Sequence, residues 1–369
     1  MAATNFAGLT STQKIVWSRE IWSNARDQMF IKRFTGTGDN ALIQRITDLT
    51  KTERGEQVLM HLVADLTGDG VVGDNEREGN EEAMQSYNIA LNIDIMSQQV
   101  RNKGKLSDQK SVINFREQAR DKLAYWLANR IDQLAFLTLS GVSYAYYNNG
   151  AARTGSAFPT LAFASDVSVP STNRHRRWYV STTNSLQTGA TASVAATDVP
   201  SYEMIVQLIA YAKQSYVKPL MSGGKEYYVL MVHPRTLAKL KMDSNYINAI
   251  VNAAPKGTDN PFFTGATVTV DGAVIHEHRL VYNTLGATSG SAKWGSGSNV
   301  DGSRSLLCGA QALGMADLGP PEWEEKSFNY GAQQGISIDK MLGLRKPKFM
   351  SPVHGTVEDF GVIACDHAI

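Results

Sequence analysis

The sequence predicts a mixed α+β protein, and three features of the chain carry this prediction. Residues 107–139 place apolar residues at helical spacing over a long stretch. Residues 56–106 hold two short runs with strand-like composition around a polar loop, as paired strands do. From residue 199 onward, helix-like and strand-like segments alternate. We find no internal repeat of fixed period, so a repeat architecture is not expected.

The first expected helix covers residues 10–35. Ile15, Trp17, Ile21 and Trp22 recur at near-helical spacing, and polar residues fall mostly on the other faces. Two tryptophans on one helix need an apolar surface to pack against. Either this chain or a neighbouring chain must supply that surface.

Residues 56–106 are expected to form an extended two-stranded arm. The strand-like runs Val58–Leu66 and Ile89–Ile95 flank the Gly-rich, acidic loop Thr67–Glu82. An isolated two-stranded ribbon is marginally stable in water and needs something to pack on. We therefore expect this arm to find a partner surface.

The clearest helix spans Ser107–Leu139. Phe115, Leu123, Trp126 and Ile131 belong to an apolar stripe at three-and-four spacing, and Ser140-Gly141 should end the helix. At ~1.5 Å per residue such a helix is roughly 50 Å long, which is the length of a strut.

Residues 140–200 are rich in Ser, Thr, Ala and Gly, and we expect them to form an exposed insertion with irregular strands. This segment contains the basic cluster Arg174, His175, Arg176 and Arg177. The remaining elements are expected at Met204–Tyr216 (helix), Tyr227–Val232 (buried strand), Arg235–Met242 (short helix), Thr267–Val281 (hairpin around Asp271-Gly272) and Gly335–Ala364 (strands).

Composition excludes several classes of protein. The chain is 43% hydrophobic with a net charge of +1, which argues against intrinsic disorder and against a strongly basic nucleic-acid binder. Only Cys308 and Cys365 are present, so neither a disulfide framework nor a multi-cysteine metal site is expected. The longest apolar run, Tyr227–Val232, is far shorter than the ~20 residues of a membrane span.

One stretch resembles a calcium-binding loop. Asp65, Thr67, Asp69, Gly70 and Glu76 occupy positions 1, 3, 5, 6 and 12 of an EF-hand-like pattern. An EF-hand needs a helix on each side of its loop, and here the preceding run reads equally well as a strand. We therefore favour an acidic, turn-rich loop over a calcium site.

Two further patterns suggest ligands. Gly68, Gly70 and Gly73 match the spacing of a dinucleotide-binding loop, but the acidic residues that follow would repel phosphate. His276 and His278 share one strand face and could both reach a metal, yet no other histidine stands at a spacing that completes a site. No phosphate-binding loop or nucleophile motif is found, so we expect no catalytic residues, no cofactor and no enzyme activity.

The order of these parts, together with several short segments, resembles the major capsid proteins of tailed phages with the Hong Kong 97 fold. The resemblance covers about residues 50–345 and is greatest to the branch typified by the N-four coliphage. The segments that carry it are Gly73–Ala83, Val100–Lys105, Asn260–Ala266, Ile275–His278 and Leu306–Ala312.

This resemblance implies a division of the chain into the parts of that fold. The parts are an N-terminal arm (1–55), an E-loop (56–106), a P-domain with a spine helix (107–139) and an insertion (107–200 in all), an A-domain (201–318), and a P-domain return with the C-terminus (319–369). The Ser/Thr-rich insertion departs from the family pattern.

The resemblance further implies a structural protein that self-assembles as pentamers and hexamers into an icosahedral head enclosing double-stranded DNA. The implied location is the virion capsid, after assembly in the cytoplasm of the bacterial host and without a membrane. Its partners would be other copies of the chain, a separate scaffolding protein, a portal protein and the packaged DNA. Whether a decoration protein binds is left open.

Two sets of residues are expected to act in this role. The expected subunit-interface residues are Trp17, Trp22, Glu76, Glu78, Glu81 and Glu82, and the DNA-facing candidates are Arg174, Arg176 and Arg177. Two alternatives stay open: the shell protein of an encapsulating compartment on the same fold, and a metal- or nucleotide-dependent enzyme that uses Asp65, Asp69 and Glu76 or the two histidines.

Overall fold

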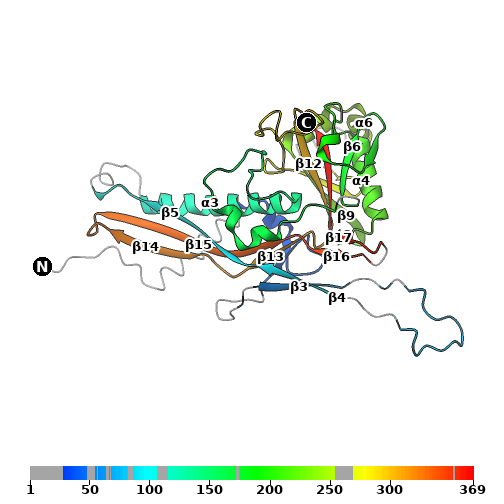
Figure 1. Ribbon diagram of the computed structural model, residues 1–369, viewed down its shortest axis with the longest axis horizontal. Coiled ribbons are helices and arrows are strands. Elements are labelled where there is room, and N and C mark those ends of the chain that lie inside the picture. Colours follow the sequence, from blue (N-terminus) through cyan, green and yellow to red (C-terminus); the bar gives the residue numbers. More distant parts are fainter. Residues whose placement is uncertain are drawn as a thin grey trace.

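The computed structural model describes residues 28–47, 55, 57–63, 66, 68–81, 86–105, 115–171, 174–253, 269–351 and 354–369. These residues form a long body and a compact lobe at one end of it (Figure 1). Residues 10–27 of the expected helix, including Trp17 and Trp22, lie outside the described residues. The expected end of that helix at residue 35 is wrong, because a 3-10 turn spans Ile31–Phe34 and a strand begins at Thr35.

The elements of the first half of the chain are η1 Ile31–Phe34, β1 Thr35–Gly36, β2 Ile43–Ile46, β3 Gln57–Val63, β4 Ser86–Asn92, β5 Asp94–Arg101, α3 Phe115–Ser140, η2 Phe158–Thr160, η3 Ala162–Asp166, β6 Arg176–Val180 and β7 Ser185–Gln187. Those of the second half are η4 Thr191–Ser193, α4 Tyr202–Gln214, β8 Leu220–Ser222, β9 Lys225–Val232, α5 Pro234–Met242, α6 Ser244–Ala253, β10 Thr269–Val270, β11 Ala273–Glu277, β12 Gly302–Cys308, β13 Leu313–Asp317, β14 Glu322–Phe328, β15 Gln333–Arg345, β16 Lys348–Met350, β17 Val357–Asp359 and β18 Val362–Ala368. The prediction of a mixed α+β protein is confirmed. Among the described residues, no helix combines the length and the apolar character that crossing a membrane requires.

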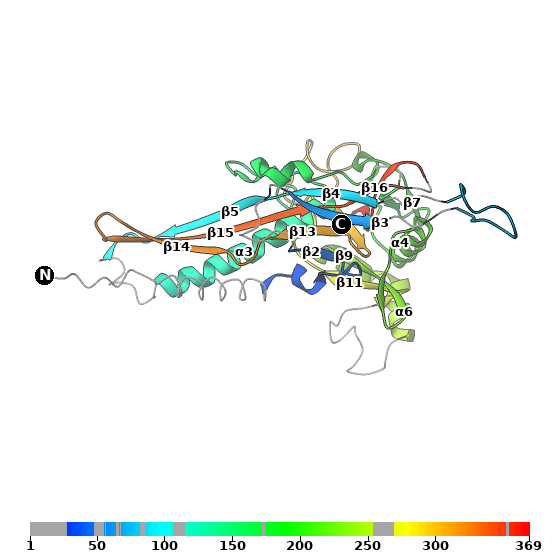
Figure 2. The same cartoon turned by 90° about the horizontal axis from the view of Figure 1, so that it is seen from below.

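The long body is a six-stranded sheet with α3 lying along it (Figures 1 and 2). Its central strand, β15, pairs antiparallel with β14 on one side and with β5 on the other. Side chains alternate along each strand, so Met96, Trp323, Ile336 and Ile338 share one face and enter the core cluster that also contains α3.

Helix α3 ends where the sequence predicts. Gly141 has a φ of +64°, its N–H donates to the Thr138 carbonyl, and the N–H of Val142 donates to the Leu137 carbonyl. This is the Schellman pattern, which favours glycine because other residues are strained at such a φ. The predicted start at Ser107 lies outside the described residues. Residues 131–140 are all buried, so this half of the helix is enclosed on every side.

The compact lobe is an eight-stranded sheet in the order β10-β11-β9-β12-β18-β6-β7, with β8 paired to β9. Leu230, Leu307 and Ile363 point to the face that packs on α4. Their neighbours Met231 and Leu306 point to the opposite face and join the core around α3. The sheet is thus covered on both sides.

The expected elements of this lobe are confirmed. Helix α4, strand β9, helix α5 and the turn between β10 and β11 lie where the pattern placed them. The turn residues Asp271 and Gly272 have φ of +48° and +87°, as a tight two-residue hairpin turn requires.

The expectation for residues 140–200 is wrong in one respect. Strands β6 and β7 do not stand apart as an exposed insertion, because β6 pairs in parallel with β18 and extends the sheet of the lobe. The predicted boundaries at residues 200/201 and 318/319 therefore do not follow the sheets. Strand β6 precedes the first boundary and β18 follows the second, yet both belong to the sheet of the lobe, whereas β13 lies between the two boundaries and belongs to the long sheet. Composition could not predict this pairing, because the partner of β6 is a strand almost two hundred residues later in the chain.

Candidate assembly surfaces

The arm at residues 56–106 has a ribbon stem, in which β3 and β4 pair antiparallel from Gln57↔Asn92 to Val63↔Ser86. Val58, Met60, Ile89 and Leu91 form its inner face and are buried against the long sheet, in the cluster that contains Ala316. The alternate residue Leu59 is 49% exposed. The ribbon therefore packs on the body by one face only, which is how a half-polar strand pair is stabilised.

The stem is clamped at its base. The predicted strand Ile89–Ile95 breaks at Ile93, where β4 ends and β5 begins. There the carboxylate of Asp166 accepts two hydrogen bonds from Asn92, one from the backbone N–H (3.0 Å) and one from the side chain (3.1 Å). Asp166 thus holds the point at which the chain passes from the ribbon into the long sheet.

Beyond the stem lies the acidic loop, defined here as residues 68–81. All but one of its residues are exposed, and Gly70, Gly73 and Gly79 have positive φ. Two of its hydrogen bonds are local: Glu81 accepts from the Gly79 N–H (2.8 Å) and the Asn75 side chain donates to the Val72 carbonyl. The loop is thus a self-folded turn at the far end of the ribbon.

The acidic loop carries five carboxylates against one arginine. Ion pairs within the described residues engage none of these carboxylates. Glu76, Glu78 and Glu81 are exposed, as an interface role requires, whereas Glu82 lies outside the described residues. So do Asp65 and Thr67, so the calcium hypothesis for this loop is not tested.

A second surface element is the segment that leads out of the N-terminal arm. The buried carboxylate of Asp132 on α3 accepts hydrogen bonds from the backbone N–H groups of Phe30 (2.9 Å) and Ile31 (3.2 Å). Burial raises the pKa of Asp132 to about 6, although these two hydrogen bonds oppose the shift. One carboxylate therefore anchors the chain to helix α3 at this point.

The two candidate metal-binding histidines lie in the same place and act as aromatic rings. His278 stacks on Phe30 (4.3 Å between ring centroids) and on Phe136 (5.1 Å), and His276 meets Phe34 edge-on (5.0 Å). Burial is the main cause that lowers the pKa of His278 to about 4, so the ring is neutral when it stacks at pH 7. In the described part of the chain, no group of three or more His, Cys, Asp or Glu side chains is arranged to hold a metal.

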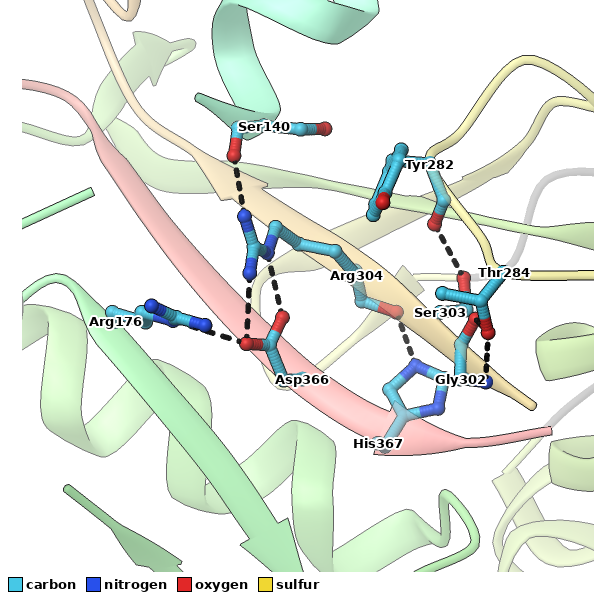
Figure 3. A network of polar contacts seen from close by, with 10 residues as sticks. Ser140, Arg176, Tyr282, Thr284, Gly302, Ser303, Arg304, Asp366 and His367 are labelled. Atoms are coloured by element: carbon cyan, nitrogen blue, oxygen red, sulfur yellow. Dashed lines mark hydrogen bonds and ion pairs between the residues drawn. The ribbon is translucent and has the colours of Figure 1, made fainter. Parts of the chain in front are cut away.

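A buried polar network joins the end of α3 to the centre of the compact lobe (Figure 3). Arg304 on β12 donates to both carboxylate oxygens of Asp366 on β18, at 2.6 and 2.9 Å. Its remaining terminal nitrogen donates to the Ser140 carbonyl at 2.6 Å, and Arg176 approaches Asp366 from β6 at 3.2 Å. Buried charges need such partners, and here the partners come from three strands and one helix end.

The basic cluster is built into this lobe. Arg176 is only 14% exposed and pairs with Asp366, while Arg177 hydrogen-bonds to Tyr211 and lies over its ring. The Arg174 side chain is 43% exposed and lies 3.6 Å from Glu358. The expectation that this segment is an exposed insertion is therefore wrong for Arg176 and Arg177, because these two side chains meet acidic or aromatic groups of their own chain.

Sequence reasoning missed Asp132, Arg304 and Asp366. A weak signal exists for two of them, because Arg304 and Asp366 are the only Asp, Glu, Lys or Arg residues in strands β12 and β18. A charge in such a run is almost never buried without a partner. Nothing in the sequence says which partner that is.

Comparisons with known proteins bear on the whole chain. A family model described as phage capsid protein matches residues 5–369. The major capsid protein of Pseudomonas phage KPP25 is 51% identical over 362 residues, which cover 98% of this chain and 96% of that protein.

Solved structures agree in fold. The capsid of Ralstonia phage GP4 is 26% identical with a TM-score of 0.74, over 92% of this chain and 91% of that one. The capsid asymmetric unit of cyanophage Pam1 is 17% identical with a TM-score of 0.71, over 100% and 96% of the two chains.

Proposed function

The chain belongs to the phage capsid protein family and is a structural component of the virion capsid, and on that premise we propose that it assembles in pentamers and hexamers into an icosahedral head that encloses double-stranded DNA. Family membership implies a structural rather than a catalytic role. It also favours a virion over an encapsulating compartment.

The observation that carries the proposed assembly is the one-sided packing of the ribbon β3–β4 and the exposure of the acidic loop beyond it. The loop and its flank expose Leu66 (59%) and Val72 (77%) beside unneutralised carboxylates. Apolar area buried on a neighbour stabilises an assembly by about 25 cal/mol per Å². Repeated over many copies, weak contacts of this kind add up to a stable shell.

We assign the parts of the chain to the Hong Kong 97 fold in accordance with this function. The ribbon and acidic loop are the E-loop, α3 is the spine helix, the long sheet is the P-domain and the compact lobe is the A-domain. Because β6, β7 and β18 pair within the lobe, residues 176–187 and 362–368 are assigned to the A-domain as well.

The proposed partners follow from the same role: a separate scaffolding protein during assembly, a portal at one vertex and the packaged DNA. Of the three DNA-facing candidates we favour Arg174. Its side chain is 43% exposed, whereas that of Arg176 is 14% exposed. The interface role of Trp17 and Trp22 also stays a prediction.

The test is assembly of a chain without the acidic loop. In one variant Gly68–Glu82 is deleted, and in a second variant the same segment is replaced by a Gly/Ser linker of equal length, which keeps the loop length but removes its side chains. Each is expressed with the scaffolding protein of its phage and viewed by negative-stain electron microscopy, with light scattering on the same sample.

We expect closed shells from the unaltered chain and soluble, folded but unassembled protein from both variants. Shells of normal size from the deletion variant would remove the E-loop assignment. An unaltered chain that stays monomeric with its scaffolding protein present would overturn the proposed assembly itself.

A further inference from the structure

A fully buried lysine and a fully buried aspartate face each other where the long body meets the compact lobe. Lys346 follows the end of β15, and Asp359 is the last residue of β17. Both side chains are completely shielded from solvent, and Nζ of Lys346 lies 3.3 Å from Oδ1 of Asp359. The short strands β16 and β17 carry the chain from one residue to the other at this junction (Figure 1).

Hydrogen bonds do not satisfy the two facing atoms. Neither Lys346 Nζ nor Asp359 Oδ1 makes a hydrogen bond of good geometry to any residue that the structure describes. Taking an ion out of water is costly, so a buried ion pair needs additional hydrogen bonds to be stable. Lys340, which is also buried in β15, meets this requirement, because its ammonium donates to the Asp317 carboxylate and to the Gly319 carbonyl. Lys346 does not meet it.

The carboxyl group of Asp359 is held by its other oxygen. Oδ2 accepts a hydrogen bond from the backbone N–H of Ser171 (3.0 Å), and this contact leaves Oδ1 directed toward Lys346. When a nucleophile adds to a carboxyl carbon, negative charge develops on one oxygen, and a backbone N–H already in place stabilises that charge. The amine, the carboxyl carbon and the donor for the developing charge are therefore assembled in one buried place.

The protonation states of the neighbouring groups suit an attack by nitrogen. Burial lowers the pKa of Lys346 to about 8, although the charge of Asp359 opposes the shift, so about one molecule in ten carries the free amine at pH 7. The charges of Asp359 and Lys346 both act on the pKa of His175, and burial lowers that pKa, so the ring is neutral at pH 7. Its Nδ1 has no hydrogen-bond partner among the described residues. A neutral imidazole in this position can accept a proton and return it.

We propose that Lys346 and Asp359 form an isopeptide bond within the chain. Nζ of the free amine attacks Cγ of the carboxylic acid, negative charge collects on Oδ2 beside the Ser171 N–H, and the Cγ–Oδ1 bond breaks. Counted from the ammonium and the carboxylate, two protons move from nitrogen to Oδ1, which leaves as water. The step therefore needs no oxidant and no co-reactant. A neutral amide replaces two desolvated charges, and the exclusion of solvent from these atoms opposes hydrolysis.

The bond would close a covalent loop from Lys346 to Asp359 around the β16–β17 hairpin. This hairpin also touches the ribbon, because the Tyr87 hydroxyl donates to the Met350 carbonyl (3.0 Å). Strand β15 belongs to the long sheet, and β18, which begins shortly after Asp359, belongs to the sheet of the lobe. The bond thus fixes the chain where it passes between these two parts. Such a link stabilises a fold mainly by restricting the unfolded chain, and it needs no second copy.

The first test is the mass of the purified, denatured chain. We expect the unaltered chain to be lighter by one water, about 18 Da, than the Lys346→Arg variant after allowance for the substitution itself. Trypsin then locates the loss, because it cuts after Arg345 and after Lys348. Peptides 346–348 and 349–369 should appear joined, with one water missing. A succinimide at an Asp-Gly step also loses one water, but it leaves these two peptides separate.

Three variants complete the experiment, each checked for folding by circular dichroism. Lys346→Arg and Asp359→Ala each remove one reacting group, so both should show the full sequence mass and two separate peptides. The matched control is Lys293→Arg. Lys293 lies 2.7 Å from Asp301, but the two side chains are 17% and 33% exposed, so water reaches them. This control should keep the mass deficit of the unaltered chain.

A folded, unaltered chain with its full sequence mass and two separate peptides would overturn the isopeptide bond. A mass deficit that persists in Lys346→Arg would overturn it as well, because the missing water would then come from another site. Both measurements are made on the denatured chain, whether or not it had assembled. A failure here therefore leaves the proposed function untouched, and a failure of assembly leaves the isopeptide bond untouched.

Discussion

Replacing Asp366 with Asn removes one negative charge from the middle of the compact lobe while keeping the shape of the side chain. In the native chain this carboxylate receives both Arg304, from β12, and Arg176, from β6. The Asn side chain offers one oxygen as an acceptor but turns an NH₂ group toward a guanidinium. The substitution therefore leaves Arg304 without its counter-charge.

The magnitude follows from burial. The side chains of Arg304 and Asp366 are 5% and 1% exposed, and their two hydrogen bonds are 2.6 and 2.9 Å long. Removing one partner of such a buried pair costs about 3–5 kcal/mol, because the remaining charge stays desolvated and uncompensated. That is a large part of the ~5–15 kcal/mol by which a native domain is stable.

Two further variants separate burial from charge as such. Arg176→Met removes the outer, more exposed partner and leaves Asp366 paired with Arg304, so we expect a loss of only about 1 kcal/mol. The combined replacement Arg304→Met, Asp366→Leu and Arg176→Met removes all three charges of the cluster, and apolar replacement of a buried ionic cluster is often nearly neutral. We therefore expect the triple variant and Arg176→Met to lie close to the unaltered chain in free energy of unfolding, and Asp366→Asn to lie far below all three.

The assay is urea denaturation of the unassembled chain at pH 7, followed by far-UV circular dichroism and tryptophan fluorescence. If Asp366→Asn lowers the free energy of unfolding by less than about 1 kcal/mol, or if the triple variant is the least stable of the set, the reasoning from buried charge is refuted.

Two other predictions use groups buried in the same lobe. Burial lowers the pKa of His367 to about 4, so its neutral form, which hydrogen-bonds to Ser305, contributes stability that is present above pH 6.5 and is lost as the pH falls toward 4. Between pH 7 and pH 5, the free energy of unfolding should therefore fall by about 2 kcal/mol less in His367→Gln than in the unaltered chain. Urea denaturation at the two pH values measures both decreases, and equal decreases would contradict this prediction. Burial also raises the pKa of the Cys308 thiol to about 12 and raises that of Cys365, so neither should react with iodoacetamide at pH 8 in the native chain. Mass spectrometry should find labelling only after unfolding, and rapid labelling of the native chain would show that this core opens.

Several local features could be predicted from the sequence because they depend on neighbours along the chain. The end of α3 at Ser140 follows from Gly141, which tolerates the positive φ of a helix C-terminus. The turn between β10 and β11 follows from Asp271-Gly272, and the two-stranded arm from two strand-like runs around a polar loop. In each case a few adjacent residues already contain the physical cause.

Other features depend on residues that only folding brings together. Phe30 meets Asp132 across 102 positions, and Arg304 meets Asp366 across 62. Arg176 and Arg177 lie in a segment that looks like an exposed insertion when taken alone, but β6 places them beside β18, whose residues lie almost two hundred positions later. A local pattern carries no information about which distant strand will pair with it.

The sequence by itself determined the fold class, the long helix α3, the ribbon with its acidic loop and, through the order of these parts, the family resemblance. Short-range periodicity and turn chemistry suffice for such features, because they act within a few residues. Only the tertiary structure decided which charges are buried and paired and which stay free at the surface. Desolvation depends on what covers a group, and here the covering residues come from distant parts of the chain.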